Sequence, residues 1–307
     1  MLTAGHGPAR GSCKEQKGTV VALRASVIVS CFDRPHNLAR CLEGFRSQRA
    51  GGFEVLVADD GSGEETRAVI RLARVDFPVP LRHVWHRDAG FRKCSILNRA
   101  IRMARAEYLI FTDADCVPHR CFVENHLRHR RAGRYLVGRS VKWSPRRSRQ
   151  IDTRAIRAGR HARIALRDIW ENLRGDTRYL PQGLYLPGEL GHRLGRRFKK
   201  NLSARGGNLS MWKRDLVSVN GWNEEFTSWG LEDVELGMRL GWAGLSPLSI
   251  SHRALTFHLY HPAGDKTNRS ARRAYNASKQ RRSPWCPNGL VKDAGASQMP
   301  PRAATGQ

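Results

Sequence analysis

Seven segments of the first 116 residues alternate between two hydrophobic patterns, and this alternation limits the possible folds more than any other feature. Short apolar runs rich in β-branched residues are typical of buried parallel strands. The stretches between them repeat apolar residues at helical spacing. Such an alternation predicts an α/β fold with a parallel sheet and helices on both faces. In chain order the expected elements are 25–30, 35–49, 54–58, 64–74, 81–85, 90–106 and 108–111.

Two acidic pairs follow expected strands directly, Asp59-Asp60 after the second and Asp113-Ala114-Asp115 after the fourth. The carboxyl ends of strands in open α/β sheets are where ligands bind. Carboxylates that share one spot favour a hard cation such as Mg²⁺ or Mn²⁺, which prefers carboxylate and phosphate oxygens. Taken alone, an Asp-x-Asp motif is as well explained by a turn or a helix cap.

Several classes of protein are disfavoured by what the sequence lacks. No Gly-x-Gly-x-x-Gly follows the first strand, and no Gly-x-x-x-x-Gly-Lys-Ser/Thr motif occurs, which argues against dinucleotide-binding and P-loop folds. The seven cysteines include no Cys-x-x-Cys pair, so we interpret them as reduced thiols of a cytoplasmic protein. No apolar run is long enough to span a membrane. Residues 1–24 lack the apolar core of a secretory signal.

The chain is strongly basic, with 54 Lys and Arg against 27 Asp and Glu, which favours anionic partners. Part of this charge lies in a segment where a helix is expected near 154–173. The apolar stripe of that helix consists of Ala155, Ala158, Ala162, Ala165, Ile169 and Leu173. Its opposite side carries Arg157, Arg160, Arg163 and Arg167. Two interpretations stay open: a solvated basic face over a packed stripe, or a helix facing an anionic membrane or a phosphorylated acceptor.

The second half contains further polar residues beside expected elements. A helix is expected at 119–132 and a strand at 134–143, and a Gly-Gly turn at 206–207 leads into a short strand. Glu232 and Asp233 open a helix, where acidic residues can simply answer the helix dipole. His258 and His261 lie near the end of the last expected strand and are either structural or metal ligands.

These motifs together resemble family 2 glycosyltransferases. The matching stretches of the first half are SVIVSCFDRP, EVLVADDGS, GFRKCSILNRAI and EYLIFTDADC. The stretch GGNLSMWKRDLVSVNGWNEEFTSWGLEDVELGMRL is similar to a segment of galactosyltransferases and chondroitin-type polymerases. The resemblance covers residues 25–262 and implies the GT-A fold, a Rossmann-like, nucleotide-sugar-binding mixed sheet flanked by helices in a single large domain.

We therefore expect five regions along the chain. They are a disordered lead-in (1–24), a nucleotide-sugar-binding half (25–142), a basic helical insertion (143–200), an acceptor and catalytic half (201–262) and a basic disordered tail (263–307).

The resemblance also implies roles for single residues. The first loop would cup the nucleobase, Asp59 would contact the base or ribose, and Trp229 would form a wall against the sugar. The donor-binding residues are Ser30, Phe32, Arg34, Asp59, Arg92, Asn98, Asp113 and Trp229.

The same resemblance implies a metal site and a base. Asp113 and Asp115 match the metal and diphosphate motif, with Asp115 preferred as the direct ligand. A histidine would complete the metal shell, and both His258 and His261 fit that position. Asp233 matches the catalytic base, with Glu232 as its neighbour.

Sugar transfer needs this set of groups on chemical grounds. A divalent cation, Mn²⁺ or Mg²⁺, neutralises the leaving diphosphate, a carboxylate takes the proton of the acceptor hydroxyl, and one base without a second nucleophile implies inversion. The expected donor is UDP-linked galactose, N-acetylgalactosamine or glucose, in that order. The expected acceptor is lipopolysaccharide, capsule, another surface glycan or a small glycoside. We expect a cytoplasmic enzyme of polysaccharide and cell-envelope biosynthesis, peripheral at the inner face of the membrane.

Two rival functions were weighed. The charge suggests a nucleic-acid-binding protein, but no recognition-helix, zinc-finger or RNP pattern occurs, so nucleic acid is not an expected partner. A sugar nucleotidyltransferase would also use paired carboxylates, but it would carry a Gly-rich basic loop where this chain has SCFDRP.

Overall fold

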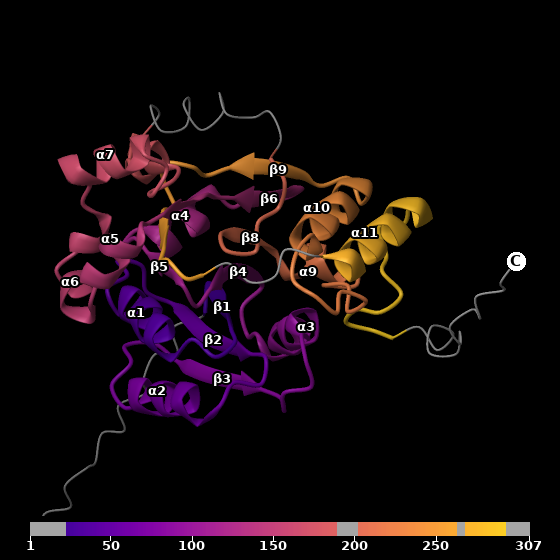
Figure 1. Cartoon of the computed structure of the whole chain (residues 1–307). Helices are drawn as coiled ribbons and strands as arrows, with labels where there is room; N and C mark the ends of the chain where they lie inside the picture. The colour runs from indigo at the N-terminus through magenta and orange to yellow at the C-terminus, as the bar shows by residue number, and fades with distance from the viewer. Residues whose placement is uncertain (1–22, 189–201, 263–267, 293–307) are drawn as a thin grey trace, which may run out of the picture.

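The computed structural model describes residues 23–188, 202–262 and 268–292 (Figure 1). Nearly all of the expected lead-in, and the tail beyond residue 292, lie outside the described residues, so their expected disorder stays a prediction. Within the described part of the chain, no helix is long and apolar enough to cross a membrane.

A seven-stranded mixed sheet forms the centre of the molecule, and it confirms the expected fold class (Figure 1). Its strand order is β3-β2-β1-β4-β8-β6-β9. The first four strands are parallel, whereas β8 runs antiparallel to both β4 and β6. The bounds are β1 (Ala25–Cys31), β2 (Phe53–Asp59), β3 (Leu81–Trp85), β4 (Tyr108–Asp113), β6 (Arg134–Val137), β8 (Leu209–Trp212) and β9 (Ser246–Ser249).

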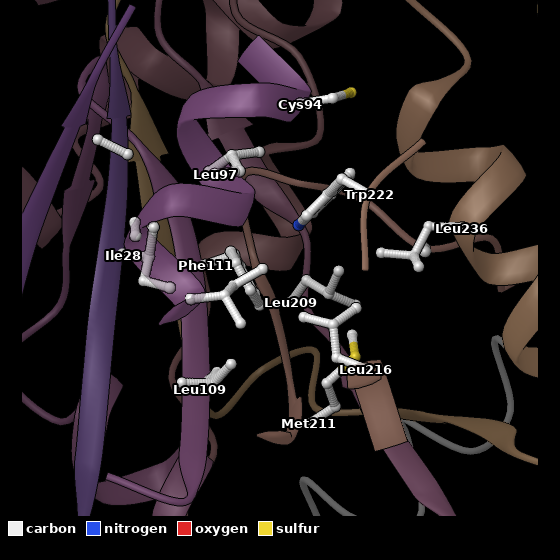
Figure 2. Packing of buried hydrophobic residues seen from close by; sticks show 14 of the residues in the cluster. Ile28, Cys94, Leu97, Leu109, Phe111, Leu209, Met211, Leu216, Trp222 and Leu236 are labelled. Carbon is white, nitrogen blue, oxygen red and sulfur yellow. The ribbon is translucent and has the colours of Figure 1, made fainter. Parts of the chain in front are cut away.

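Alternate side chains of the parallel strands point into two hydrophobic layers, one on each face of the sheet, as the two-residue period of a strand requires. Val27 and Val55 face the layer formed by α1 (Pro35–Arg46), α2 (Glu64–Arg74) and α4 (Phe122–His129). Ile28 and Phe111 face the other layer, where they pack with Trp222 and three helices (Figure 2). Those helices are α3 (Lys93–Met103), α9 (Lys213–Val217) and α10 (Glu232–Trp242).

A second, three-stranded sheet joins distant segments in the order β5-β10-β7. It contains β5 (Cys116–Pro118), β7 (Ser140–Lys142) and β10 (Thr256–His258). The single strand expected at 134–143 is therefore wrong, because the chain changes sheets between β6 and β7. The change occurs at Gly138, where a Cβ would stand 2.2 Å from the Asn208 amide nitrogen. The switch brings β7 and β10 beside the end of β4.

The single helix expected near 154–173 is also wrong, because this segment forms several short elements. They are α5 (Pro145–Gln150), α6 (Thr153–Arg157), η1 (Arg160–Ala162), α7 (Leu166–Leu173) and η2 (Leu180–Gly183). Gly159 ends the first helical stretch with a φ of +69°, a left-handed conformation that glycine adopts at little cost. Ala155 is buried whereas Leu173 is 74% exposed, so the expected stripe does not lie on one packed face.

The expected disorder of the tail is wrong for one segment, which forms α11 (Arg269–Arg281). Most residues of α11 are polar, but Ala271 and Ala274 form a narrow face of small residues that packs into the core beside α10. Ser278 Oγ donates to Glu235 Oε1 over 2.7 Å and fixes the contact. Composition alone concealed a helix that is stabilised by packing on another element.

Candidate active site

The site lies where the parallel strands end. The register places Ser30 opposite Asp113, and Cys31 opposite Asp59, so these strand ends form one row. Ser30 Oγ donates to Asp113 Oδ1 over 3.0 Å. This is the switch point of the sheet, since β2 and β3 follow on one side of β1 whereas β4 lies on the other, and ligands of such sheets bind here.

Asp115 forms a cluster with His258 and His261, and their possible ligand atoms all lie within 4.8 Å of one another. His261 Nε2 lies 3.1 Å from Asp115 Oδ2, and His258 Nε2 lies 3.6 Å from Asp115 Oδ1. Burial alone would raise the pKa of Asp115, but the hydrogen bond from His261 and the charges of both histidines lower it to about 2. The carboxylate is therefore ionised at neutral pH, as a metal ligand must be.

The donor set of this cluster fits a divalent cation. Carboxylates suit Mg²⁺ and Mn²⁺, imidazole nitrogens are common ligands of divalent transition metals, and the neighbouring Asp113 offers a further oxygen. Cys116 also lies within reach of Asp113 and Asp115. Burial raises the pKa of its thiol well above the usual value. Hard cations such as Mg²⁺ and Mn²⁺ prefer carboxylate oxygens to sulfur, so Cys116 is the less suitable ligand for them. The residues that fit a cation are thus two carboxylates and two histidines.

Lys93 connects the two halves of the site and had no role in the sequence analysis. Its Nζ lies 3.3 Å from Asp113 Oδ1 and 3.4 Å from Glu232 Oε1. Burial alone would lower the pKa of Lys93, but Asp113, Glu232 and Asp233 raise it, so the ammonium is charged. A lysine as the first residue of a helix opposes the helix dipole. That conflict was the available sequence signal that Lys93 serves another purpose.

Asp233 and Glu232 lie at the start of α10, beside the Gly-Gly turn that precedes β8. Asp233 Oδ2 accepts the backbone N–H of Gly206 over 3.2 Å, and Oδ1 accepts the N–H of Val234 over 2.8 Å. Burial, followed by the adjacent Glu232, raises the pKa of Asp233. The result is a fixed carboxylate with increased proton affinity.

Asp59 and Asp60 each bind a histidine that the sequence analysis did not single out. His83 Nε2 lies 2.8 Å from Asp59 Oδ2, and His86 Nε2 lies 2.7 Å from Asp60 Oδ1. The backbone N–H of Arg92 donates to Asp60 Oδ2 over 2.9 Å, which fixes the start of α3. Strand pairing indicates this contact, because β3 pairs with β2 and places His83 opposite Val57, two residues before Asp59.

The remaining predicted residues divide into two groups. Phe32 is 48% exposed and Trp229 is 60% exposed, so both rings are free to contact a ligand, and Arg34 follows Phe32 in the same loop. Asn98 belongs to the second group. It is fully buried, and its amide donates to Trp222 O and Glu224 Oε1 while accepting the Trp222 N–H. Asn98 therefore holds α3 against the 222–224 turn, and its contact with a donor stays a prediction.

The sequence matches two family models. Residues 26–201, more than half of the chain, match the model of glycosyl transferase family 2. Residues 197–262 match the model described as the N-terminal domain of galactosyltransferase. The chain belongs to glycosyltransferase family 2.

Individual relatives agree with this assignment. The chain is 27% identical over 253 residues to validoxylamine A glucosyltransferase from Streptomyces hygroscopicus subsp. jinggangensis, covering 80% of this chain and 58% of the relative. It is 26% identical over 230 residues to chondroitin synthase from Pasteurella multocida, covering 70% of this chain and 22% of that protein. The chain thus spans less than two thirds of the length of these relatives.

Solved structures share the fold at low identity. The S. aureus TarS structure has a TM-score of 0.51 and 16% identity, covering 78% of this chain and 37% of TarS. A mannosyltransferase from Pyrobaculum calidifontis, solved with GDP-Man and Mn²⁺, has a TM-score of 0.51 and 17% identity. That match covers 84% of this chain and 62% of the mannosyltransferase. These likenesses establish the GT-A fold.

Proposed function

We propose that the chain is a metal-dependent inverting glycosyltransferase that moves a sugar from a nucleoside diphosphate to a hydroxyl group. The observation that carries this proposal is the convergence of a candidate cation site and a fixed carboxylate base on one strand end. Asp115 groups with the two histidines and also with Asp113, and Lys93 links Asp113 to the start of α10, where Asp233 lies.

A divalent cation, Mn²⁺ or Mg²⁺, would be held by Asp113, Asp115, His258 and His261. When bound, it neutralises the charge that develops on a leaving diphosphate. The mannosyltransferase that shares the fold was solved with Mn²⁺ and a nucleotide sugar, which supports this assignment. The Lys93 ammonium lies between Asp113 and Glu232 and balances their negative charge.

Asp233 would accept the proton of the acceptor hydroxyl. The N–H groups of Gly206 and Val234 orient its carboxylate, so little reorganisation is needed during transfer. Its raised pKa brings the carboxylate closer to the proton affinity that a general base needs at neutral pH. One base acting on the acceptor implies a single displacement with inversion at the sugar.

The donor we propose is a UDP-hexose or UDP-N-acetylhexosamine, with galactose, N-acetylgalactosamine and glucose tested in that order. The names of the relatives, a glucosyltransferase and a chondroitin synthase, support transfer of a hexose or hexosamine. We propose a surface glycan, such as lipopolysaccharide, or a lipid-linked glycan as the acceptor, met at the cytoplasmic face of a membrane.

A screen of nucleotide sugars with the purified chain and Mn²⁺ tests the proposal. We expect release of the free nucleoside diphosphate from one of the three UDP-sugars, slowly without an acceptor and faster with one. Release of pyrophosphate would instead indicate nucleotidyl transfer. Tight, salt-dependent binding of DNA without turnover of any nucleotide sugar would favour a nucleic-acid-binding protein.

A further inference from the structure

Helix α7 buries its charged face and exposes its apolar face, the reverse of what a surface helix of a globular protein does. Its buried residues are Asp168 and Glu171. Its exposed residues are spaced at i, i+3, i+4 and i+7, which places them on one side of the helix. They are Leu166, Ile169, Trp170 and Leu173, with exposed fractions of 87%, 46%, 61% and 74%.

This orientation is fixed by the polar contacts beneath the helix. Asp168 Oδ2 accepts the N–H of Ala165 over 2.8 Å, and Arg146 Nη2 lies 3.5 Å from Asp168 Oδ1. Glu171 Oε2 accepts the hydroxyl of Ser144 over 2.6 Å, and Glu171 Oε1 pairs with Arg146 Nε. Rotating α7 to bury its apolar side would break these contacts and expose the pairs, so the apolar side stays outward.

Arginines surround the exposed apolar face. Arg163, Arg167 and Arg174 are exposed. A hollow beside Trp170 is lined by Arg167, Glu171, Arg174 and Asp176. The pairs Arg167–Glu171 and Arg174–Asp176 are long, at 3.9 Å and 3.7 Å, and both arginine side chains are more than half exposed. These guanidinium groups are therefore accessible to an external anion.

We propose that the exposed face of α7, with these arginines, docks on an anionic membrane surface. Leucine, isoleucine and tryptophan side chains beside arginines are the composition of helices that lie in the interface of a bilayer. The arginines add attraction to anionic headgroups, which fades within a Debye length. A second copy of this chain is a poorer occupant, because pairing two α7 faces would bring two arginine sets of like charge together.

The docking surface is connected to the candidate active site by a short path. Ser144, which holds Glu171 of α7, follows Trp143, whose backbone N–H donates to the carbonyl of His258 over 3.0 Å. Docking at α7 would therefore be linked through Ser144 and Trp143 to the backbone of His258. Delivery of a lipid-linked acceptor would rest on the proposed function, whereas the docking itself does not.

Co-sedimentation of the full chain with vesicles tests this proposal. We expect binding to phosphatidylcholine vesicles that contain phosphatidylglycerol, and binding that weakens as salt rises. Replacing Leu166, Ile169, Trp170 and Leu173 with Ser should weaken the binding more than about tenfold. The matched control is L72S/V75S at the carboxyl end of α2, where two apolar side chains are 77% and 84% exposed, and this variant should bind like the parent.

The outcomes separate the explanations. If the parent ignores anionic vesicles, or if the four-residue variant binds like the parent, the proposal is wrong. It is also wrong if the parent forms a dimer that the four-residue variant abolishes. If that variant melts at a lower temperature than the parent, vesicle binding is measured instead with L166S/L173S, which changes only the two most exposed positions. Release of nucleoside diphosphate without vesicles should be the same in these variants as in the parent. If the parent itself releases no nucleoside diphosphate, the proposed function is wrong, but the docking proposal is unaffected.

Discussion

Asp233 and Glu232 are adjacent carboxylates with different partners. Glu232 Oε1 lies 3.4 Å from the Lys93 ammonium, whereas the Asp233 oxygens accept the backbone N–H groups of Gly206 and Val234. An ion-paired carboxylate is held by its cation, whereas Asp233, whose pKa is raised, is better suited to take a proton. This difference between neighbouring side chains is the basis for assigning the base.

Replacing Asp233 with Asn should therefore abolish most of the transfer. The amide keeps the shape of the side chain but cannot accept the proton, and loss of a general base costs about 10²–10⁴-fold in rate. Donor affinity should change little, which isothermal titration with the nucleotide sugar would measure. Near-normal turnover of this variant would assign the base to another residue, with Glu232 the next candidate.

The raised pKa of Asp233 also predicts how the rate depends on pH. Protonated Asp233 cannot accept the acceptor proton, so kcat/KM should fall as pH drops through this pKa, at a higher pH than for an ordinary aspartate. Burial is the largest cause and the charge of Glu232 the next, so Glu232→Gln should move the acid limb to lower pH. A limb that does not move in that variant would argue that another group controls it.

The Gly-Gly turn before β8 is the element that brings the two carboxylate sites together. Gly206 orients Asp233, and a Cβ at Gly207 would stand 2.9 Å from Asp113 Oδ2. Thr112 Oγ1 donates to the Gly207 carbonyl over 3.0 Å, which ties the turn to β4. The turn therefore needs a residue without a side chain at the position that faces Asp113.

Gly207→Ala should lower turnover by about 10–100-fold, because a shift of Asp113 by a few tenths of an ångström to 1 Å misplaces the donor. The melting midpoint should change much less than the rate. Gly51→Ala is the control, since a Cβ there would meet nothing within 4 Å, and it should leave both properties unchanged. Full turnover of Gly207→Ala would show that Asp113 tolerates displacement.

Across the molecule, the strands and helices of the first half could be predicted from the spacing of their apolar residues. Each of these elements is regular and buries a defined face. The elements after residue 130 were harder to predict from the sequence. The chain changes direction at Gly138, through a close contact, and at Gly159, through a left-handed dihedral angle, and the spacing of apolar residues indicates neither. The packing of α11 depends on α10, which comes about 30 residues earlier in the chain.

The candidate site was predictable to the extent that its residues occupy recognisable motifs. Asp113, Asp115 and Asp233 do so. In the structure, Lys93 links Asp113 to Glu232, the neighbour of Asp233. Lys93 and His83 were missed, because their importance comes from the carboxylates they meet across the sheet rather than from their neighbours in sequence. The resemblance assigns Asn98 to donor binding, and the structure adds a different role that the motif does not encode, because its buried amide binds the turn at Trp222.

In the proposed function, the two halves of the chain build one cation-assisted site for sugar transfer. The most direct test measures release of nucleoside diphosphate from the active UDP-sugar in excess chelator, and again after Mn²⁺ or Mg²⁺ is restored. We expect turnover to vanish with chelator, to return with the metal, and to be lost in a variant that carries both His258→Ala and His261→Ala. Full turnover in excess chelator would contradict the claim and remove the cation from the mechanism.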